Sequence, residues 1–290
     1  MKIAHIGCHQ PFHTETEICD YLELAGHEVD RYQFDRMDTG IFLQRASGFD
    51  VVICSLPQCF PPDFWRVLRR KGPKTVAWYF DWIADWGGRE QQYLPRLAEF
   101  DLIISTDGFE NEIYDGLPRF WLPHAADPRT YKPCGMNATR DVAFCGHMYL
   151  PRRREMIRGL IKKYDFAQYG LNNECWGPRY AEACANAKVT IGDNFRNDYP
   201  GYWSDRLYLA TSCQAFILYP AVPGIETQFI SGKHFDTYKN ESDLHEKIDW
   251  YLAHPEERWT IAKAGREHAH KYHNWGIRVA EFEEILLKNL

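Results

Sequence analysis

Short apolar runs alternate with segments of helical pattern along the first half of the chain. The runs that read as strands are "KIAHIG", "HEVDRYQF", "DVVICSL", "KTVAWYF", "DLIIST" and "RFWLP". Helical stretches such as "FWRVLRR" and "QQYLPRLAEF" separate most of them. Strands that alternate with helices predict a parallel sheet covered by helices on both faces.

This rhythm stops and then restarts near the middle of the chain. The segment "HAADPRTYKPCGMNATR" has no period and is rich in turn-forming residues. Strand patterns return in "DVAFCG", "FAQYG", "KVTIG" and "AFILYP", and the chain ends in helical stretches. We therefore expect an α/β fold with two doubly wound domains, over residues 1–135 and 136–274. Open sheets of this kind bind ligands at the carboxyl ends of their strands, so a cleft between two facing domains is the expected site.

The composition narrows the class of protein. With 45% hydrophobic residues in 290, the chain can build substantial cores. The net charge of -6 argues against a protein that grips nucleic acid over its whole surface, although it allows a local basic patch. The N-terminus lacks a signal-peptide core, and no run of about 18 apolar residues predicts a membrane span. Nine cysteines without a C-x-x-C pair favour reduced thiols in a cytoplasmic protein.

A glycine and several cations follow the strand pattern in "DVAFCGHMYLPRRRE". Gly146, with His147 beside it, allows backbone N–H groups to approach a ligand, and the next helix presents its positive end there. Arg152 opens a run of arginines in the first turn of that helix, where cations are unfavourable for the helix dipole. The pattern fits either a bound phosphate, whose charge would explain the arginines, or a solvated basic face.

The loop "YGLNNECWG" follows the next predicted strand. Tyr169, Gly170 and Trp176 belong to it, and such a loop could hold a nucleobase by stacking and by backbone hydrogen bonds. The alternative is that Trp176 serves only for packing.

A helix start follows in "SDRLYLATSCQAF". Ser204 suits the N-cap position, and Asp205 suits the first turn. Arg206 can pair with a diphosphate while the N–H groups of the helix hold its oxygens. The alternative for Ser204 is ordinary capping.

The strand pattern "AFILYP" ends in the loop "AVPGIE". Gly224 allows close backbone approach to a ligand, with Ile225 next to it. Glu226 could accept two hydroxyls of a ribose, or it could be a surface acid that starts a helix. Because these groups come from consecutive strand ends of one sheet, a ligand site is the better reading of the set.

A catalytic acid or base could come from the first domain. Candidates at strand ends are His9, His13, Asp81 and Asp107. We favour Asp81, whose aromatic neighbours predict an apolar setting that would raise its pKa, and His13, which lies just before a helix. Asp81 could equally cap the next helix. If the reaction retains configuration no base is needed, and the sequence does not decide between inversion and retention.

The motifs taken together resemble a known family. "WLPHAADPRTYKP", "DVAFCGHMYLPRRREMI", "YWSDRLYLATSCQAFILYPAVPGIETQF" and "YLAHPEERWTIAKAGREHAHKYHNWGIR" look like group 1 glycosyltransferases of the two-domain GT-B architecture. They look most like the branch named for the spore maturation protein CgeB. The resemblance covers residues 100–285 well and residues 1–100 more loosely.

The resemblance implies two Rossmann-like domains, with the acceptor on the N-terminal one and a nucleotide-sugar donor on the C-terminal one. It also implies that residues 275–290 form a helix that returns to the N-terminal domain. The co-substrate would be a nucleoside-diphosphate sugar, with a UDP-sugar as the first expectation, and no cofactor would be permanently bound. No catalytic metal is expected, and the sequence has no HxxH or DxD motif at a plausible strand end.

The chain departs from the family pattern in its acids. Many group 1 enzymes carry two glutamates eight positions apart, and here those positions hold Gly201 and Leu209. Gln214 replaces the usual glycine. Glu226 is the best substitute for the carboxylate that would bind the ribose.

Several alternatives remain open at this stage. The acceptor could be a glycan, a small molecule, a protein or a modified DNA base, and the oligomeric state is undetermined. The basic run "WRVLRRKGPK" could meet DNA, as in a phage-type DNA-base glycosyltransferase, although a solvated helix face is the stronger reading. The missing glutamates also allow a degenerate, non-catalytic nucleotide or sugar binder. An epimerase of the same architecture is a weaker rival.

Overall fold

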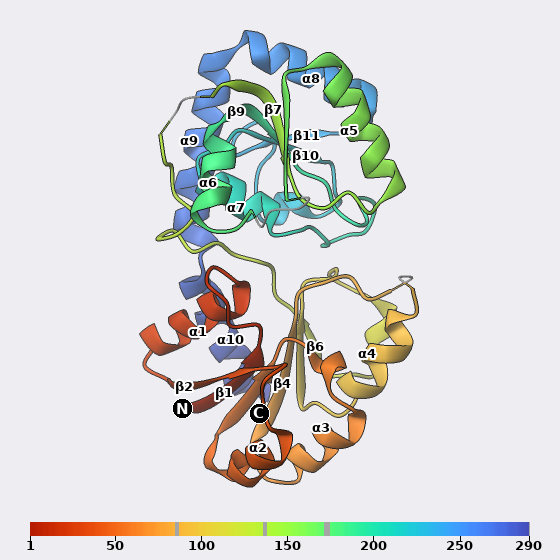
Figure 1. Cartoon of the computed structure of the whole chain (residues 1–290), viewed down its shortest axis with the longest axis vertical. Coiled ribbons are helices and arrows are strands. Elements are labelled where there is room, and N and C mark those ends of the chain that lie inside the picture. The colour runs from red at the N-terminus through yellow and green to blue at the C-terminus, as the bar shows by residue number, and fades with distance from the viewer. Residues whose placement is uncertain (85–86, 136–137, 171–174, 290) are drawn as a thin grey trace. The chain divides into compact units, whose positions relative to one another are not determined.

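The chain folds into two compact units. The computed structural model describes residues 1–84, 87–135, 138–170 and 175–289 (Figure 1). The first unit comprises Met1–Pro123 and Trp275–Leu290, and the second comprises His124–Asn274. The division therefore falls at residue 123 and not after residue 135. Residues 124–131 belong with the second unit because they bond to it: Ala126 N donates to His273 O, and Ser212 Oγ donates to Tyr131 O.

The first unit contains one parallel sheet with the strand order β2-β1-β3-β4-β5-β6. Its strands are β1 (Lys2–Gly7), β2 (Glu28–Gln33), β3 (Val51–Cys54), β4 (Lys74–Tyr79), β5 (Leu102–Ser105) and β6 (Arg119–Trp121). Its helices are α1 (Thr14–Leu24), α2 (Thr39–Arg45), α3 (Pro62–Arg69), α4 (Arg89–Leu97) and α10 (Trp275–Asn289). All six predicted strands of this half are present.

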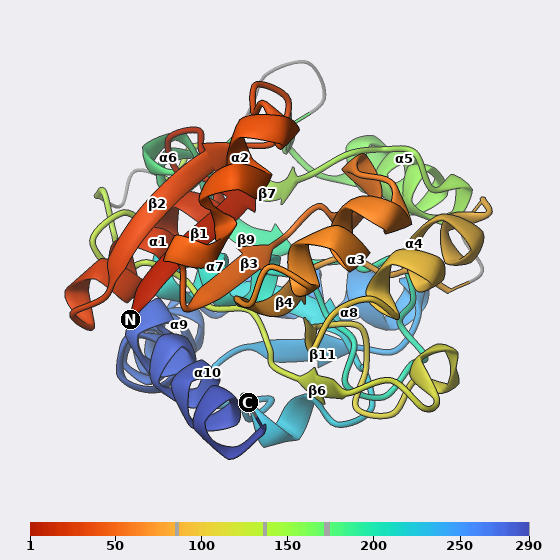
Figure 2. The ribbon, with the colours of Figure 1, turned by 90° about the horizontal axis from the view of Figure 1, so that it is seen from below.

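Strand β4 shows how this sheet is covered on both faces. Its side chains alternate between the faces, as in any strand. The Trp78 ring stacks on Phe282 of α10 at 4.7 Å between centroids, whereas Tyr79 packs against Tyr93 of α4 at 4.8 Å. Figure 2 shows α10 along one side of the sheet and α3 and α4 along the other. The last helix of the chain thus belongs to the N-terminal sheet, as the family resemblance implied.

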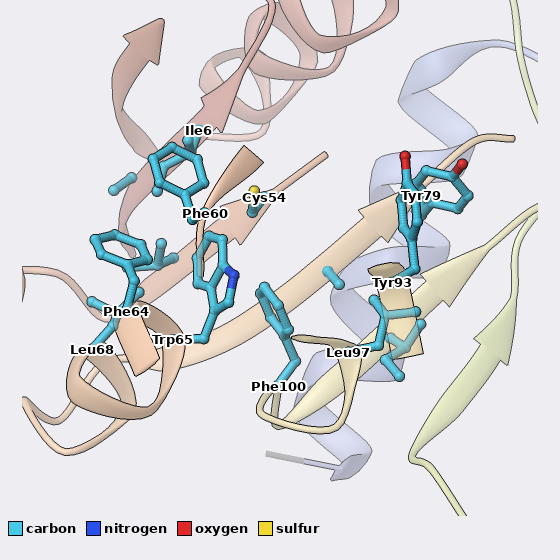
Figure 3. Packing of buried hydrophobic residues seen from close by; sticks show 14 of the residues in the cluster. Ile6, Cys54, Phe60, Phe64, Trp65, Leu68, Tyr79, Tyr93, Leu97 and Phe100 are labelled. Carbon is cyan, nitrogen blue, oxygen red and sulfur yellow. The ribbon is translucent and has the colours of Figure 1, made fainter. Parts of the chain in front are cut away.

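The core on the α3 and α4 face is rich in aromatic rings (Figure 3). Trp65 lies at its centre with no exposed surface, and its ring centroid is 4.6 Å from that of Phe100. The indole Nε1 donates to Pro57 O at 3.2 Å, so its polar atom is satisfied. Large rings at close spacing bury much apolar area per residue and make this face rigid.

The second unit contains another parallel sheet, with the order β11-β10-β9-β7-β8. Its strands are β7 (Arg140–Cys145), β8 (Phe166–Tyr169), β9 (Ala187–Ile191), β10 (Ile217–Pro220) and β11 (Asp236–Tyr238). Its helices are α5 (Pro151–Lys163), α6 (Pro178–Ala185), α7 (Arg206–Ser212), α8 (Glu241–Ala253) and α9 (Pro255–Tyr272). Figure 1 shows α5 on one side of this sheet and α6 on the other. The predicted α/β class with two Rossmann-like halves is confirmed.

Both sheets reverse their winding direction once. In the first unit the reversal lies between β1 and β3, and in the second it lies between β7 and β9. The loops that leave neighbouring strands diverge at such a point and open a crevice at the carboxyl edge of the sheet. These two edges are where functional groups are expected.

Candidate functional site

Two glycines bring neighbouring loops together at the carboxyl edge of the second sheet. Gly146 follows β7 with a φ of 151°, and Gly170 follows β8 with a φ of 84°. A Cβ atom on Gly170 would lie 3.1 Å from the backbone nitrogen of Gly146. A Cβ atom on Gly146 would lie 2.5 Å from Nη2 of Arg206. Only glycine therefore lets these two loops and the arginine lie so close.

Two hydrogen bonds hold the side chain of Arg206 and leave donors of its guanidinium unused. Its Nε donates to Cys145 O at 2.7 Å, and its Nη1 donates to Ser204 Oγ at 3.1 Å. The guanidinium carbon is 5.7 Å from the ring centroid of Phe144. Within the described residues Nη2 makes no hydrogen bond. The side chain is half-buried, so a fixed positive group with spare donors faces this edge.

The helix start differs from the prediction. Helix α7 begins at Arg206, so the position before it is Asp205, which has helical angles and makes no side-chain cap. The prediction that Ser204 is the N-cap is wrong. Its hydroxyl instead lies 3.0 Å from the hydroxyl of Tyr219 on β10 and accepts from Arg206. Ser204 therefore positions the guanidinium of Arg206 and does not cap the start of α7.

The arginines at the start of α5 have an anion of their own. Arg152 Nη1 lies 2.6 Å from Asp193 Oδ1, and Arg153 Nε lies 2.8 Å from Asp193 Oδ2. Asp193 is fully buried, and so is Arg153 apart from 1% of its surface. Arg154 donates to the carbonyl groups of Met148 and Tyr149. A carboxylate of the protein thus neutralises part of the charge of these arginines. Neither a bound phosphate nor a solvated face alone explains them.

Asp193 and Asn194 were not among the residues that the sequence singled out. Both lie just after β9, beyond Gly192, at the point where the sheet reverses direction, and both are buried. Asn194 Oδ1 accepts from Ser204 N at 2.9 Å and also from the hydroxyl of Tyr219. Two polar residues immediately after an apolar strand were the signal that could have found them. They tie this loop to the segment that carries Arg206.

The loop after β10 has the expected backbone. Gly224 adopts the left-handed conformation with a φ of 87°, and a short 3-10 turn over Ile225–Thr227 follows. Ile225 is buried, whereas Glu226 is exposed. Because β10 lies next to β9 in a parallel sheet, this loop leaves the same edge as Asp193. The carboxylate of Glu226 is free to meet a ligand from solvent.

The remaining donor candidates lie at the rim of this edge. His147 is exposed, and its ring stacks on Tyr149 at 6.2 Å between centroids. Tyr169 is half-buried, and its carbonyl accepts from Gly146 N at 2.9 Å. The side chain of Trp176 is 39% exposed. Residues 171–174 of the same loop lie outside the described residues.

The positions of the missing glutamates are apolar and closed. Leu209 is 4% exposed inside α7, and Gly201 is buried. Neither position faces solvent.

The first unit contributes a carboxyl group that sequence reasoning missed. Glu15 lies in the first turn of α1, beside the loop after β1, and it is 9% exposed. A Cβ atom on Gly7 would lie 2.9 Å from Glu15 Cγ. Burial, with a smaller contribution from the charge of Asp81, raises the pKa of Glu15 to about 7. A carboxyl group with this pKa exchanges protons near neutral pH.

Of the two predicted catalytic residues, Asp81 has surroundings other than those expected. The side chain of Asp81 is 67% exposed, and Arg89 Nη1 lies 3.7 Å from Oδ2. The apolar setting predicted for Asp81 is therefore wrong, because Trp78 and Trp82 are buried away from solvent while the carboxylate is not. His13 occupies the N-cap position of α1 and is half-buried, just before the helix as predicted.

The other two candidates of this unit are tied into the fold. Asp107 is buried and accepts from the hydroxyl of Tyr114 at 2.8 Å. His9 Nε2 lies 3.0 Å from His5 O. Among the described residues, His5, His9 and Cys19 form the one group with metal-ligand geometry, with ligand atoms within 4.8 Å of one another. Burial raises the pKa of the Cys19 thiol to about 12, so the cluster is neutral as it stands.

The basic run in α3 and the turn after it is partly neutralised by acids of the same unit. Arg66 Nη2 lies 2.7 Å from Glu99 Oε1, and Arg69 Nε lies 2.8 Å from Asp101 Oδ1. These pairs favour a solvated helix face over a polyanion site. Across the described parts of the chain, no helix combines the length and the apolar character that crossing a bilayer requires.

Comparison with known proteins points to glycosyltransferases, the class that the sequence motifs resemble. Residues 152–284, most of the second unit, match the sequence model of the family described as "Glycosyl transferase-like". None of the curated proteins compared by sequence matches the chain.

Similar solved structures span the whole chain. The sucrose-phosphate synthase of Thermosynechococcus elongatus shares 14% identity and has a TM-score of 0.68, covering 99% of this chain and 98% of its own. The HepE protein of Anabaena, solved with UDP and glucose, shares 11% identity with a TM-score of 0.67, covering 99% and 100%. A glycosyltransferase of Rickettsia africae ESF-5 shares 9% with a TM-score of 0.64, covering 100% and 99%. The chain is thus similar to glycosyltransferases of the GT-B type, in fold over its whole length and in sequence over residues 152–284.

Proposed function

We propose that the protein transfers a sugar from a UDP-sugar to an acceptor hydroxyl. The observation that carries the proposal is the half-buried guanidinium of Arg206, which lies against Gly146 and keeps Nη2 without a hydrogen bond in the described residues. A positive group with spare donors beside closely packed glycine loops suits a diphosphate. The HepE structures, which hold UDP or UDP-glucose, support this choice of donor.

We assign the donor contacts by the chemistry of each side chain. The diphosphate accepts from Arg206 Nη2 and from backbone N–H groups near Gly146. The carboxylate of Glu226 accepts hydrogen bonds from the ribose hydroxyls, because it is exposed in a loop at the same edge of the sheet. Tyr169 and Trp176 are the aromatic side chains available for the base. These roles remain predictions that the experiments below test.

The transfer forms one bond and breaks another. The acceptor oxygen bonds to the anomeric carbon of the sugar, and the bond from that carbon to the diphosphate oxygen breaks. The diphosphate leaves with the bonding electron pair, and Arg206 stabilises its charge. The proton of the acceptor hydroxyl goes to a base, for which we propose Glu15, with Asp81 and His13 as the other candidates of the first unit. In this proposal Arg206 offsets part of the leaving group's charge, and no metal ion is required.

Finer assignments follow from sequence features. We place the chain in the CgeB-like branch because of its motif set, and in the cytoplasm because its nine cysteines are free thiols. The acceptor class is left to experiment among glycan, small molecule, protein and modified DNA base.

A nucleotide panel tests the proposal. The melting temperature is measured with UDP, ADP, GDP and TDP, and then with the UDP-sugars. UDP should raise it by mass action, and a UDP-sugar should slowly release UDP in a hydrolysis assay. Absence of a shift with all four nucleotides at millimolar concentration would sink the proposal. Binding without any release of UDP would identify a non-catalytic binder instead.

A further inference from the structure

A pocket of about 560 Å³ opens at the amino edge of the second unit's sheet. It lies where β9 and β10 begin, with the last residues of α6 and α7 and the first turns of α9 around it. The donor candidates occupy the opposite, carboxyl edge of the same strands. Helix α7 links the two places: it begins at Arg206 and leads to Gln214, which lines the pocket. The pocket is therefore not part of the donor site.

The lining of this pocket is cationic. Lys132, Lys188, Arg258 and Arg266 line it, and no carboxylate does so among the described residues. Lys188 is neutralised by Asp141, whose Oδ1 lies 2.7 Å from Nζ. The other three have no carboxylate within ion-pair distance in the part of the chain described.

The two arginines sit on one face of α9. Residues eight apart on a helix share a face, and about 12 Å of helix axis separates them. The small Ala262 lies between them and leaves room for a ligand. Arg258 is half-buried, donates to Tyr251 O and has its pKa lowered by burial alone. A partly desolvated cation without a counter-charge is unfavourable unless an anion arrives.

Gln214, directly after the C-cap of α7, fixes the position of one arginine of the pocket. It has a φ of 60°, one of two non-glycine residues in the left-handed region among those described. This conformation ends α7: Gln214 N donates to Thr211 O and Ala215 N donates to Ala210 O, both at 2.9 Å. Gln214 Oε1 accepts from Arg266 Nη1 at 3.4 Å. The end of α7 thus holds one of the two arginines in the pocket.

The rest of the lining is apolar and aromatic. Phe216 is 5% exposed and forms part of the wall, whereas Trp259 is 42% exposed and next to Arg258 in sequence. A large exposed indole beside two cations suits a ligand with a flat body.

We propose that this pocket binds a small organic anion, with its carboxylate or phosphate between Arg258 and Arg266 and its flat apolar body against Trp259. This is a second ligand site, beyond the donor and acceptor of the proposed function. Inorganic phosphate alone can pair with the two arginines but cannot pack against the indole of Trp259. A neutral aromatic molecule satisfies the indole but not the cations.

Calorimetric titration with phenyl phosphate, benzoate, inorganic phosphate and benzyl alcohol tests the site. At least one aromatic anion should bind wild-type protein more tightly than inorganic phosphate or benzyl alcohol does. Arg258→Gln and Arg266→Gln should each weaken that binding by about tenfold, because each removes a charge-assisted contact. The matched control is Lys263→Gln, an exposed cation of the same helix outside the lining, which should bind as wild type does.

Folding of each variant is checked by its melting temperature and by its response to UDP. If an arginine variant fails to fold, Trp259→Ala, an exposed change, should weaken the aromatic anion without altering the affinity for inorganic phosphate. The proposal is overturned if neither aromatic anion binds at millimolar concentration. It is equally overturned if inorganic phosphate binds as tightly as phenyl phosphate, or if the folded variants all bind as wild type does.

Discussion

Arg153 Nε donates to Asp193 Oδ2 over 2.8 Å, although 40 residues separate the two in sequence. The pair joins the first turn of α5 to the loop after β9, at the point where the second sheet reverses its winding. Both side chains are buried, and Asp193 also accepts from Arg152. The loops that frame the candidate donor edge are therefore held by an internal charge network.

Removal of Asp193 should destabilise the protein strongly. Asp193→Ala leaves the buried Arg153 without its counter-charge, which costs about 3–5 kcal/mol of unfolding free energy. Urea unfolding measures the loss. The control is Asp198→Ala, because Asp198 is largely exposed in its pair with Arg196 and should cost less than about 1 kcal/mol. Equal losses in the two variants would contradict the structural role of Asp193.

Replacement of Arg206 should weaken donor binding. Arg206→Gln keeps a hydrogen-bonding side chain but removes the charge, so the Kd for UDP should rise about tenfold or more. Isothermal titration with UDP measures it, with uridine as the ligand that lacks the diphosphate. Uridine should bind wild type and variant alike. Arg158→Gln, which removes an exposed charge from α5, is the control, and an unchanged Kd in Arg206→Gln would remove this residue from the site.

Replacement of Glu226 should change the affinity for the ribose of UDP and leave the stability of the protein unchanged. Glu226→Gln should raise the Kd for UDP by about tenfold while the melting temperature stays the same, because the side chain is exposed. A 2′-deoxy analogue of UDP sharpens the test. Wild type should discriminate against the analogue, and the variant should have lost that discrimination. Equal discrimination by both proteins would show that the carboxylate does not contact the 2′-hydroxyl.

Glu15 should give the fold a characteristic pH dependence. Its pKa is raised from 4.5 to about 7 by burial, so between these pH values the folded state binds the proton and the unfolded state does not. Stability from this group is therefore full below pH 4.5 and is lost as the pH rises toward 7, by at most about 3 kcal/mol. Urea unfolding of wild type and Glu15→Gln across this range measures the difference.

The same substitution tests the chemical role of Glu15. If its carboxylate accepts the acceptor proton, kcat should fall as the pH drops below about 7 in wild type, and Glu15→Gln should have a much lower kcat at every pH. The control is Glu112→Gln, which changes an exposed acid in the first turn of a short helix. A pH profile of kcat that is identical in wild type and Glu15→Gln would exclude this residue as the base.

The local pattern of the chain determined much of the architecture. Alternation and apolar runs predicted every strand of the first sheet and β7 to β10 of the second, because a strand needs apolar side chains on its buried faces whatever its neighbours are. The short edge strand β11 was missed. Gly146, Gly170 and Gly224 were identifiable for a similar reason. Each stands at the end of a strand pattern or in the loop that follows it, and each has the positive φ that glycine adopts without strain.

Only the tertiary structure decided which side chains meet. The counter-charge of Arg152 and Arg153 comes from Asp193, and the hydroxyl of Ser204 turns to Tyr219 and not to its own helix. The sequence could not reveal these partners, because a parallel sheet gathers the carboxyl ends of strands that lie far apart along the chain. Burial is likewise a property of the packed sheet: it raises the pKa of Glu15, an unremarked acid of a helical pattern, while Asp81 among its aromatic neighbours stays in solvent.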